Sequence, residues 1–219
     1  MVTADLLNHN IPRLRLSDSI GKAKMLLNDF KLTHLPVVAG KQFIGLISEE
    51  DLLDIDEDTA PMENIQDRCQ LIYIQDDVPF LDAISYCQQY ETNIVPILDK
   101  EAAYMGVITA SDLLRALGDF TGANENGGVV FLEMERPHYS VSEIARIVEQ
   151  NDCTIYHLNV RPLANDMISV TLHLNKKEID SVLAAFERYD YTIVKEYGTG
   201  KRKDDTDSNY RNLMKFLDL

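Results

Sequence analysis

The chain has 219 residues and a formal net charge of −15, from 36 acidic and 21 basic residues. So acidic a chain repels phosphate backbones and anionic lipid surfaces, and we expect no nucleic acid and no membrane among its partners. Its three cysteines match no disulfide framework or metal spacing, residues 1–16 lack a secretion signal, and no apolar run approaches the ~20 residues of a membrane span. Together these features predict a cytoplasmic protein.

In chain order, the first elements read as strand, helix, strand, strand, helix. Residues 17–30 open with Ser and Asp capping candidates and carry apolar residues at helical spacing, which predicts a helix. The buried face expected for this helix is made of Ile20, Ala23, Leu27 and Phe30. The apolar runs 35–38 and 43–47 are typical of buried central strands.

The same pattern recurs further along the chain. Pro36 and Pro96 are 96 − 36 = 60 residues apart, whereas Gly45 and Gly106 are 106 − 45 = 61 residues apart. The added residue falls between the two strands of the second copy. An insertion there, with the register kept on both sides, predicts an exposed hairpin loop.

The first helix of the second copy is expected over residues 76–90, with Asp77 as its capping candidate and Pro79 in its first turn. Its expected inward face is made of Phe80, Ala83, Ile84 and Cys87. A three-stranded sheet that two short helices cover on one side leaves apolar surface bare. We therefore expect the two copies to pack together and cover each other.

Each copy ends with a polar motif where its last strand meets its last helix, Ser48-x-x-Asp51 and Thr109-x-x-Asp112. One interpretation is a capping box, in which the hydroxyl and carboxylate satisfy free N–H groups of the first helical turn. The other is a ligand site, because the same helix start presents N–H groups and a positive dipole end to an anion. The residues leave both interpretations open.

The duplicated Gly, Ser or Thr, and Asp phrase, preceded in each copy by a Pro-containing strand and a helix, resembles a tandem pair of CBS domains, a Bateman module. The resemblance covers residues 8–120, in units 1–58 and 59–120. It implies that the Asp accepts hydrogen bonds from the ribose hydroxyls of an adenosine-type ligand, such as AMP, ATP or S-adenosylmethionine. It also implies that the Ser or Thr lies beside the ribose or phosphate and that the preceding Gly lets the ligand approach. The ligand-binding residues implied are Ser48, Asp51, Thr109, Asp112, Pro36, Val37, Pro96 and Ile97.

The chain departs from this family pattern in its charges. Many nucleotide-binding pairs carry a basic residue just before the Pro-containing strand, where this chain has 33-TH-34 and 93-NI-94. Glu49 and Glu50 follow Ser48 directly and would repel a phosphate, whereas Ala110 and Ser111 follow Thr109. We therefore expect a monophosphate or S-adenosylmethionine rather than a polyphosphate, and the Thr109 cleft as the better anion site.

A linker at 121–128 separates the pair from a segment at 129–200 whose signals read strand, helix, strand, strand, helix, strand. This order predicts a ferredoxin-like fold. Its first helix is expected to begin with a Ser140 and Glu143 capping box, and its second to be capped by Asn175 with Glu178 three residues on. The first helix is expected to bury Val141, Ile144, Ala145 and Val148.

This segment resembles an ACT domain, and Arg136 and Pro137 match the loop where ACT domains bind amino acids, but the glycine of that loop is replaced. A dimerising role is therefore favoured over amino-acid binding. The order of domains is similar to that of the acetoin-utilisation type of CBS protein.

Residues 201–219 predict a charged linker and a short amphipathic helix that docks on its own domain or on a partner subunit. The apolar stripe of this helix is made of Tyr210, Leu213, Met214 and Leu217.

The chain is thus expected to be an α+β protein (mixed α/β) with two CBS units, an ACT-like domain and a short C-terminal helix. Its histidines and carboxylates match no catalytic or metal-binding motif, so no catalytic residue, metal or required cofactor is predicted. Two functions stay open. In one, the chain is a non-catalytic homodimeric sensor of an adenosine-type ligand; in the other, it is a structural or oligomerisation adaptor without a ligand.

Overall fold

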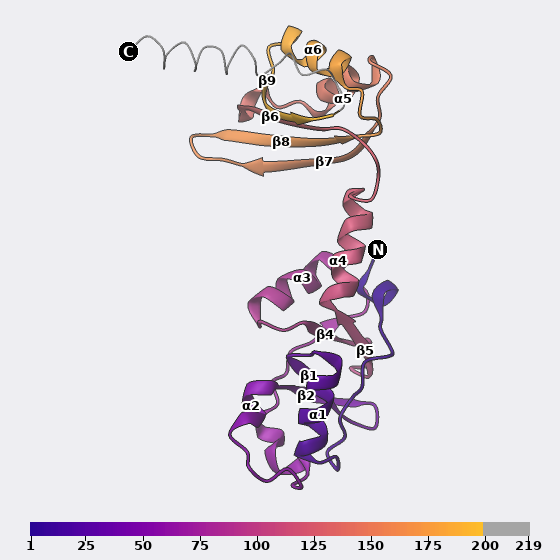
Figure 1. Ribbon diagram of the computed structural model, residues 1–219, viewed down its shortest axis with the longest axis vertical. Coiled ribbons are helices and arrows are strands. Elements are labelled where there is room, and N and C mark those ends of the chain that lie inside the picture. The colour runs from indigo at the N-terminus through magenta and orange to yellow at the C-terminus, as the bar shows by residue number, and fades with distance from the viewer. Residues whose placement is uncertain (199–219) are drawn as a thin grey trace, which may run out of the picture. The chain divides into compact units, whose positions relative to one another are not determined.

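The computed structural model describes residues 1–198, and the chain divides into two compact units, Met1–Leu117 and Gly118–Leu219. Both units combine helices and strands, which confirms the mixed α+β class (Figure 1). The C-terminal helix expected within 201–219 lies outside the described residues. No helix among residues 1–198 is both long and apolar enough to cross a membrane.

The first copy of the repeat consists of α1 (Ile20–Phe30), the antiparallel strands β1 (His34–Ala39) and β2 (Gln42–Ser48), and α2 (Glu49–Leu53), after a short 3₁₀ helix η1 (Thr3–Leu6). Ser19 caps α1, because its hydroxyl accepts a hydrogen bond from the N–H of Lys22 at 3.2 Å. The strand expected before α1 is reduced to one residue. Leu14 donates its N–H to the Pro36 carbonyl and accepts from the Val38 N–H, each at 2.8 Å.

The second copy keeps the same order, with a complete strand in the place of Leu14. It consists of the 3₁₀ helix η2 (Met62–Arg68), β3 (Ile74–Gln75), α3 (Phe80–Gln89), β4 (Ile94–Leu98), β5 (Tyr104–Thr109) and α4 (Ala110–Thr121). The three strands form one sheet in the order β3-β4-β5, with β3 parallel and β5 antiparallel to β4. Helix α4 continues through Thr121, the first residue of the expected linker.

Two details of the expected helices in this unit are wrong. Phe30 is 44% exposed, because it is the last residue of α1 and the chain turns away at Lys31 in the left-handed conformation. Asp77 does not cap α3, which begins three residues later with Pro79 at its N-cap position. The Asp77 carboxylate instead forms an ion pair with Lys100 at 3.0 Å.

The two copies of the repeat complete each other's sheets. Asn8, near the start of the first copy, donates its N–H to the Val107 carbonyl of β5 at 2.7 Å. Gln70, between η2 and β3 of the second copy, exchanges two backbone hydrogen bonds of 2.8 Å with Leu46 of β2. The largest apolar core also contains residues of both copies. The expectation that the copies cover each other is therefore confirmed.

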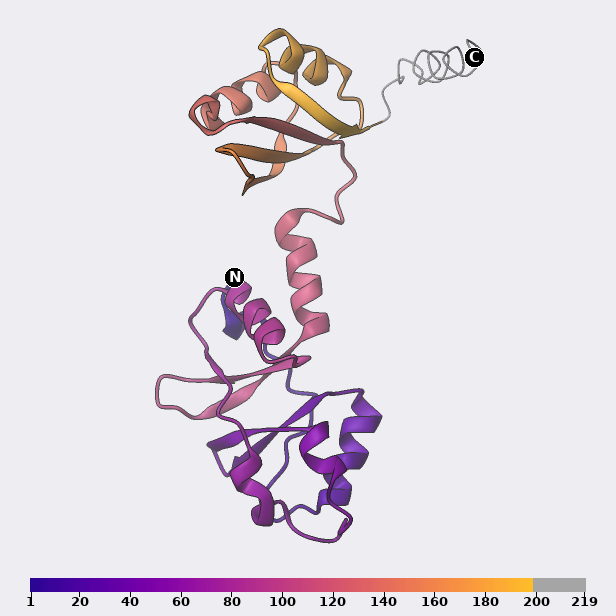
Figure 2. The same ribbon diagram turned by 90° about the vertical axis from the view of Figure 1, so that its left-hand side faces the viewer.

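The second unit forms one antiparallel sheet. Its strands are β6 (Val129–Glu135), β7 (Ile155–Pro162), β8 (Met167–Leu174) and β9 (Thr192–Tyr197), and its helices are η3 (Arg136–His138), α5 (Val141–Glu149) and α6 (Asp180–Arg188). The strand order is β7-β8-β6-β9, which confirms the ferredoxin-like topology. Figure 2 shows α5 and α6 together on one face of this sheet.

Expectations for these helices are corrected in three places. Ser140 caps α5 by accepting the Glu143 N–H, but the reciprocal half of the expected capping box is not formed, and the Glu143 carboxylate accepts the Tyr191 hydroxyl at 3.3 Å instead. Val141 is 51% exposed because it is the first helical residue, and Ile147 is fully buried instead. Asn175 does not cap α6, which begins at Asp180. Its side-chain oxygen accepts the N–H of Thr154 at 2.9 Å, so Asn175 joins the start of β7 instead.

Prediction: Gly45→Ala destabilises the chain by roughly 1–3 kcal/mol more than Gly106→Ala, as measured by chemical denaturation. Both glycines have a φ of 159°, so the backbone cost is common to the two variants. A Cβ at Gly45 would lie 2.8 Å from Cys69 Cβ and 2.9 Å from the Gln70 carbonyl oxygen. The first of these atoms is attached directly to the backbone and the second is part of it. At Gly106 the nearest atom is the movable end of Leu7, at 3.2 Å. Equal losses of stability would contradict this reading.

Candidate functional site

The first polar motif forms a complete capping box at the start of α2. The Ser48 hydroxyl accepts the N–H of Asp51 at 3.1 Å, and Asp51 Oδ2 accepts the N–H of Ser48 at 3.1 Å. The same oxygen lies 2.6 Å from the Ser48 hydroxyl. The capping interpretation is therefore confirmed for this copy. Within residues 1–198, the hydrogen bonds that the Asp51 carboxylate accepts all go to Oδ2.

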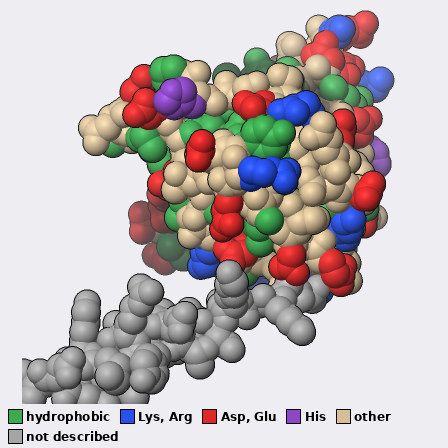
Figure 3. All heavy atoms as spheres, turned by 90° about the horizontal axis from the view of Figure 1, so that it is seen from above, with side chains coloured by type: hydrophobic (Ala, Val, Ile, Leu, Met, Phe, Trp, Pro, Cys, Tyr) green, Lys and Arg blue, Asp and Glu red, His purple; other side chains and the backbone are tan. Residues whose placement is uncertain are grey.

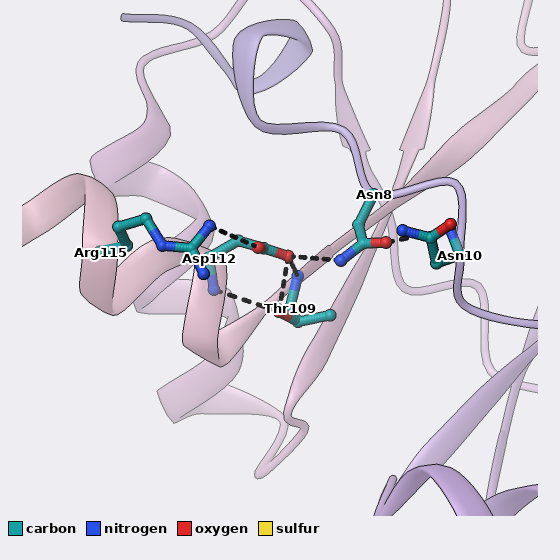
Figure 4. Close-up of polar contacts among 5 residues, drawn as sticks. All are labelled: Asn8, Asn10, Thr109, Asp112 and Arg115. Carbon is teal, nitrogen blue, oxygen red and sulfur yellow. Dashed lines mark hydrogen bonds and ion pairs between the residues drawn. The ribbon is translucent and has the colours of Figure 1, made fainter.

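The second motif repeats this geometry at the start of α4 and adds two partners. Asp112 Oδ2 lies 3.2 Å from the Thr109 nitrogen and 2.6 Å from its hydroxyl. It also accepts a hydrogen bond from Asn8 Nδ2 at 3.0 Å. Arg115 lies 3.9 Å from the other oxygen, Oδ1. Figure 4 shows the Asp112 carboxylate between Arg115 and Asn8.

These contacts keep Asp112 ionised. Burial by itself would raise its pKa, but hydrogen bonds from the Thr109 hydroxyl, the Asn8 amide and the Thr109 N–H, together with the charge of Arg115, outweigh burial and hold the pKa below its usual value. The side chain is 17% exposed, so one edge of this fixed carboxylate faces outward. A charged acceptor held in place, whose Oδ1 accepts no hydrogen bond among residues 1–198 and has only Arg115 at 3.9 Å, is suited to binding hydroxyl groups.

Asn8 is the site residue that the sequence analysis missed. Its own amide oxygen accepts the N–H of Asn10 at 3.0 Å, and its backbone N–H bonds to Val107, so the side chain is held toward Asp112. Asn8 and Asp112 are 104 residues apart, and local spacing gives no sign of such a contact. The available signal is that Asn8 and Gln70 are both polar and lie at similar positions, a few residues before Leu14 and β3 in their copies.

Thr33 and Asn93 lie just before the Pro-containing strands, where many nucleotide-binding CBS pairs carry a basic residue, and they form hydrogen bonds to each other. The N–H and hydroxyl of Thr33 donate to Asn93 Oδ1 at 3.0 and 3.1 Å, and the Asn93 N–H donates to the Thr33 hydroxyl at 3.1 Å. Their carbonyls accept the N–H groups of Glu49 and Ala110, the first residues of α2 and α4. The two capping boxes are therefore joined through one polar contact between the copies.

His34 lies beside the first box only. It pairs with Ser48 across β1 and β2, whereas the second copy has Ile94 in its place. Burial lowers the pKa of His34 below its usual value, although the charges of Asp51 and Glu50 oppose this. The surroundings of the two boxes thus differ in a neutral imidazole as well as in the acidic residues that follow Ser48.

The four apolar residues expected to line the clefts are buried in the cores: Pro36, Val37, Pro96 and Ile97. Val37 and Ile97 have no exposed surface at all, so their contact with a ligand stays a prediction. The close approach expected at the two glycines is made by the chain itself. Cys69 and Gln70 lie against Gly45, and residues 7–9 lie against Gly106.

Within residues 1–198, no group of three or more His, Cys, Asp or Glu side chains is arranged to hold a metal ion. The described face of the second unit in Figure 3 carries acidic side chains interspersed with basic and hydrophobic ones.

Comparison with curated proteins gives partial matches to larger enzymes. The chain is 26% identical over 117 residues to a homoserine O-acetyltransferase of Methanococcoides burtonii, which is 52% of this chain and 24% of that protein. It is 24% identical over 99 residues to an inosine-5'-monophosphate dehydrogenase of Methanocaldococcus jannaschii, which is 45% of this chain and 20% of that protein. The chain thus matches only about a quarter or less of the length of these relatives.

Among solved structures, the chain is similar to a CBS domain pair/ACT domain protein of Thermotoga maritima, with 19% identity and a TM-score of 0.48 over 54% of this chain and 98% of that one. It is also similar to a putative acetoin utilization protein of Vibrio cholerae, with 20% identity and a TM-score of 0.45 over 54% and 91%. A third, CBSX2 solved in complex with AMP, has 21% identity and a TM-score of 0.44 over 54% and 96%.

Residues 2–58 and 64–119 each match the CBS domain family, and together they make up more than half of the chain. Membership of this family accounts for the two repeats, their joined sheets and their two capping boxes. The chain therefore belongs to the CBS domain family and carries two copies of the domain in tandem.

Proposed function

We propose that this chain is a non-catalytic regulatory protein of the cytoplasm that binds an adenosine-type ligand in the clefts of its CBS pair. The observation that carries the proposal is the state of the two carboxylates. Each is fixed at a helix start by bonds to Oδ2, and in the described residues Oδ1 is left with no hydrogen bond.

The chemistry of a ribose suits this arrangement. The 2' and 3' hydroxyls of a ribose are two neighbouring donors, and an ionised carboxylate accepts such bonds more strongly than a neutral group does. Asp51 and Asp112 are the acceptors in this proposal, and Ser48 and Thr109 lie beside the sugar or its phosphate. Pro36, Val37, Pro96 and Ile97 would contact the base where a cleft opens around it.

The second cleft is proposed as the better site for a phosphate-bearing ligand. Helix α4 has 12 residues and α2 has 5, so α4 presents the larger dipole to an anion at its start. Ala110 and Ser111 place no charge there, whereas Glu49 and Glu50 repel an anion in the first cleft. A ligand with one phosphate or none, such as AMP or S-adenosylmethionine, fits both clefts better than a polyphosphate.

The enzymes among the relatives share only a segment about as long as the CBS pair with this chain. We therefore propose that the chain has in common with them a regulatory module rather than a catalytic one. Binding would regulate by favouring one arrangement of the chain over another, which requires that the ligand bind the two arrangements with different affinity.

A second candidate is a structural or oligomerisation adaptor without a ligand. It is favoured by the capping boxes, which are complete without any ligand. The second unit suits oligomerisation in either case, because its sheet ends in two edge strands, β7 and β9, whose outer edges pair with no other strand among residues 1–198. These strands also carry the exposed side chains Tyr156, Val160, Val194 and Tyr197. We propose that the chain forms a homodimer through this unit.

Prediction: Asp112→Ala weakens binding of adenosine by about tenfold or more, because hydrogen bonds to a charged group contribute roughly 1.5–3 kcal/mol. Calorimetric titration measures the affinity, and saturating ligand raises the free energy of unfolding by about 2.7 kcal/mol at 100 times its dissociation constant. Asp119→Ala, in the same helix, is the matched control. Unchanged adenosine affinity in a folded Asp112→Ala protein would contradict the role of Asp112, and no adenosine binding by the parent protein would favour the adaptor.

Prediction: the pair Ala110→Glu and Ser111→Glu, which copies the acidic residues of the first motif into the second, weakens AMP binding about three- to thirtyfold, since each added charge costs roughly 0.3–1 kcal/mol near the phosphate. Binding of uncharged adenosine changes much less, because the added charges act on the phosphate. Both positions are exposed, so the substitutions leave the core intact. Equal losses for AMP and adenosine would place the phosphate elsewhere.

Prediction: Asn8→Ala lowers the free energy of unfolding at neutral pH by about 1 kcal/mol, because the lost hydrogen bond favours ionised Asp112. Since the folded pKa of Asp112 is depressed, this contribution is present above its unfolded pKa and is lost as the pH falls through the folded pKa. Adenosine binding also fails at a higher pH in this variant than in the parent. Asn10→Ala, which leaves Asp112 untouched, serves as control. A difference that persists undiminished at acid pH would contradict the assignment.

A further inference from the structure

A pair of exposed arginines, Arg13 and Arg15, lies in the first unit apart from both capping boxes. Leu14 is fixed by its two backbone hydrogen bonds to β1 and is completely buried. Because side chains alternate along an extended segment, Arg13 and Arg15 on either side of it point the same way, outward from the sheet. Both are exposed, and both line one cavity.

The guanidinium groups of Arg13 and Arg15 form no ion pair with a carboxylate among residues 1–198. The nearest acidic residue in sequence, Asp18, forms its ion pair with Lys22 at 2.7 Å and accepts the backbone N–H of Arg15 at 2.8 Å, so the Arg15 guanidinium acts on it only by longer-range attraction. Other arginines of this unit are engaged, since Arg68 donates to the Asp51 carbonyl and Arg115 lies near Asp112. In a chain with a net charge of −15, two arginines one residue apart whose guanidinium groups form no ion pair with a described carboxylate are unexpected.

The cavity beside them has a volume of about 540 Å³. Its other walls are the turn at 38–40, Ser17 and Glu63. Arg13 is positioned in advance, because its guanidinium lies 6.0 Å from the centre of the Tyr104 ring. Burial raises the pKa of Tyr104 to about 12, so the phenol stays neutral and places no negative charge beside the arginine.

The repeat shows that this feature is not a by-product of the fold. Positions 13 and 15 correspond to Tyr73 and Gln75 in the second copy, at the same spacing of 73 − 13 = 60 residues that relates the two prolines. The second copy therefore builds the equivalent strand without any charge. Only the first copy places arginines at these two positions, and both line one cavity.

We propose that Arg13 and Arg15 form a binding site for a small anion that presents a phosphate or carboxylate group. Guanidinium groups bind both groups through paired N–H donors, and the hydroxyl of Ser17 adds a further donor. Glu63 on the opposite wall disfavours ligands of high negative charge. This site is independent of the two CBS clefts, and it does not require the proposed adenosine binding.

The test is calorimetric titration of the full chain with inorganic phosphate and, separately, with succinate, at constant ionic strength. The expected result is saturable binding of at least one anion at one site, weakened at least tenfold by Arg13→Gln with Arg15→Gln. The matched control, Arg161→Gln with Arg188→Gln, removes the same charge from the second unit and keeps the affinity. Which of the two anions binds decides between phosphate and carboxylate ligands.

Two further variants keep the outcomes distinct. Arg15→Gln alone should also weaken anion binding. Because this variant keeps the contact of Arg13 with Tyr104, a weaker affinity in it does not come from altered packing around Arg13. Asp51→Ala with Asp112→Ala should lose adenosine and keep the anion, whereas the double arginine variant should keep adenosine. The proposal is overturned if neither anion binds, or if the double arginine variant binds the anion as the parent does.

Discussion

The contact between Thr33 and Asn93 is the interaction on which the rest of the first unit depends. It joins the two copies through side-chain and backbone hydrogen bonds, and the carbonyls of the same two residues accept the first N–H groups of α2 and α4. Both helix starts are therefore held against one polar joint. Because Ser48 and Thr109 cap those helices, the joint also sets where the two carboxylates stand.

Capping and ligand binding are compatible uses of the same residues. A carboxylate has two oxygens, and Asp51 and Asp112 use Oδ2 for the helix start. The capping bonds restrain the side chain, so less conformational freedom is lost when a ligand engages Oδ1. Asn8 strengthens this restraint only in the second cleft, and Glu49 and Glu50 add charge only in the first. A single duplicated motif thus stands in two different surroundings, which is why we propose different ligand preferences for the two copies.

The sequence predicts the features that are set by local spacing. It fails where a residue distant in sequence binds the polar side chain that was expected to cap a helix. The repeat, the two capping boxes and the strand order of the second unit follow from periodicity and from contacts three residues apart. Asp77 and Asn175 are suitable caps by type, but Lys100 and Thr154 engage them instead. The bond between Asn8 and Asp112 crosses 104 residues, so only the folded chain reveals it. Apolar residues at helix ends, such as Phe30 and Val141, are exposed because no neighbouring layer covers them there.

A crystal structure of the chain with bound adenosine or AMP tests the central claim most directly. The account predicts that the ribose hydroxyls lie about 3 Å from Oδ1 of Asp112, while Oδ2 keeps its bonds to Thr109 and Asn8. It would be contradicted by a ligand that binds elsewhere, or by clefts that stay closed at saturating ligand with both carboxylates serving the helix starts alone.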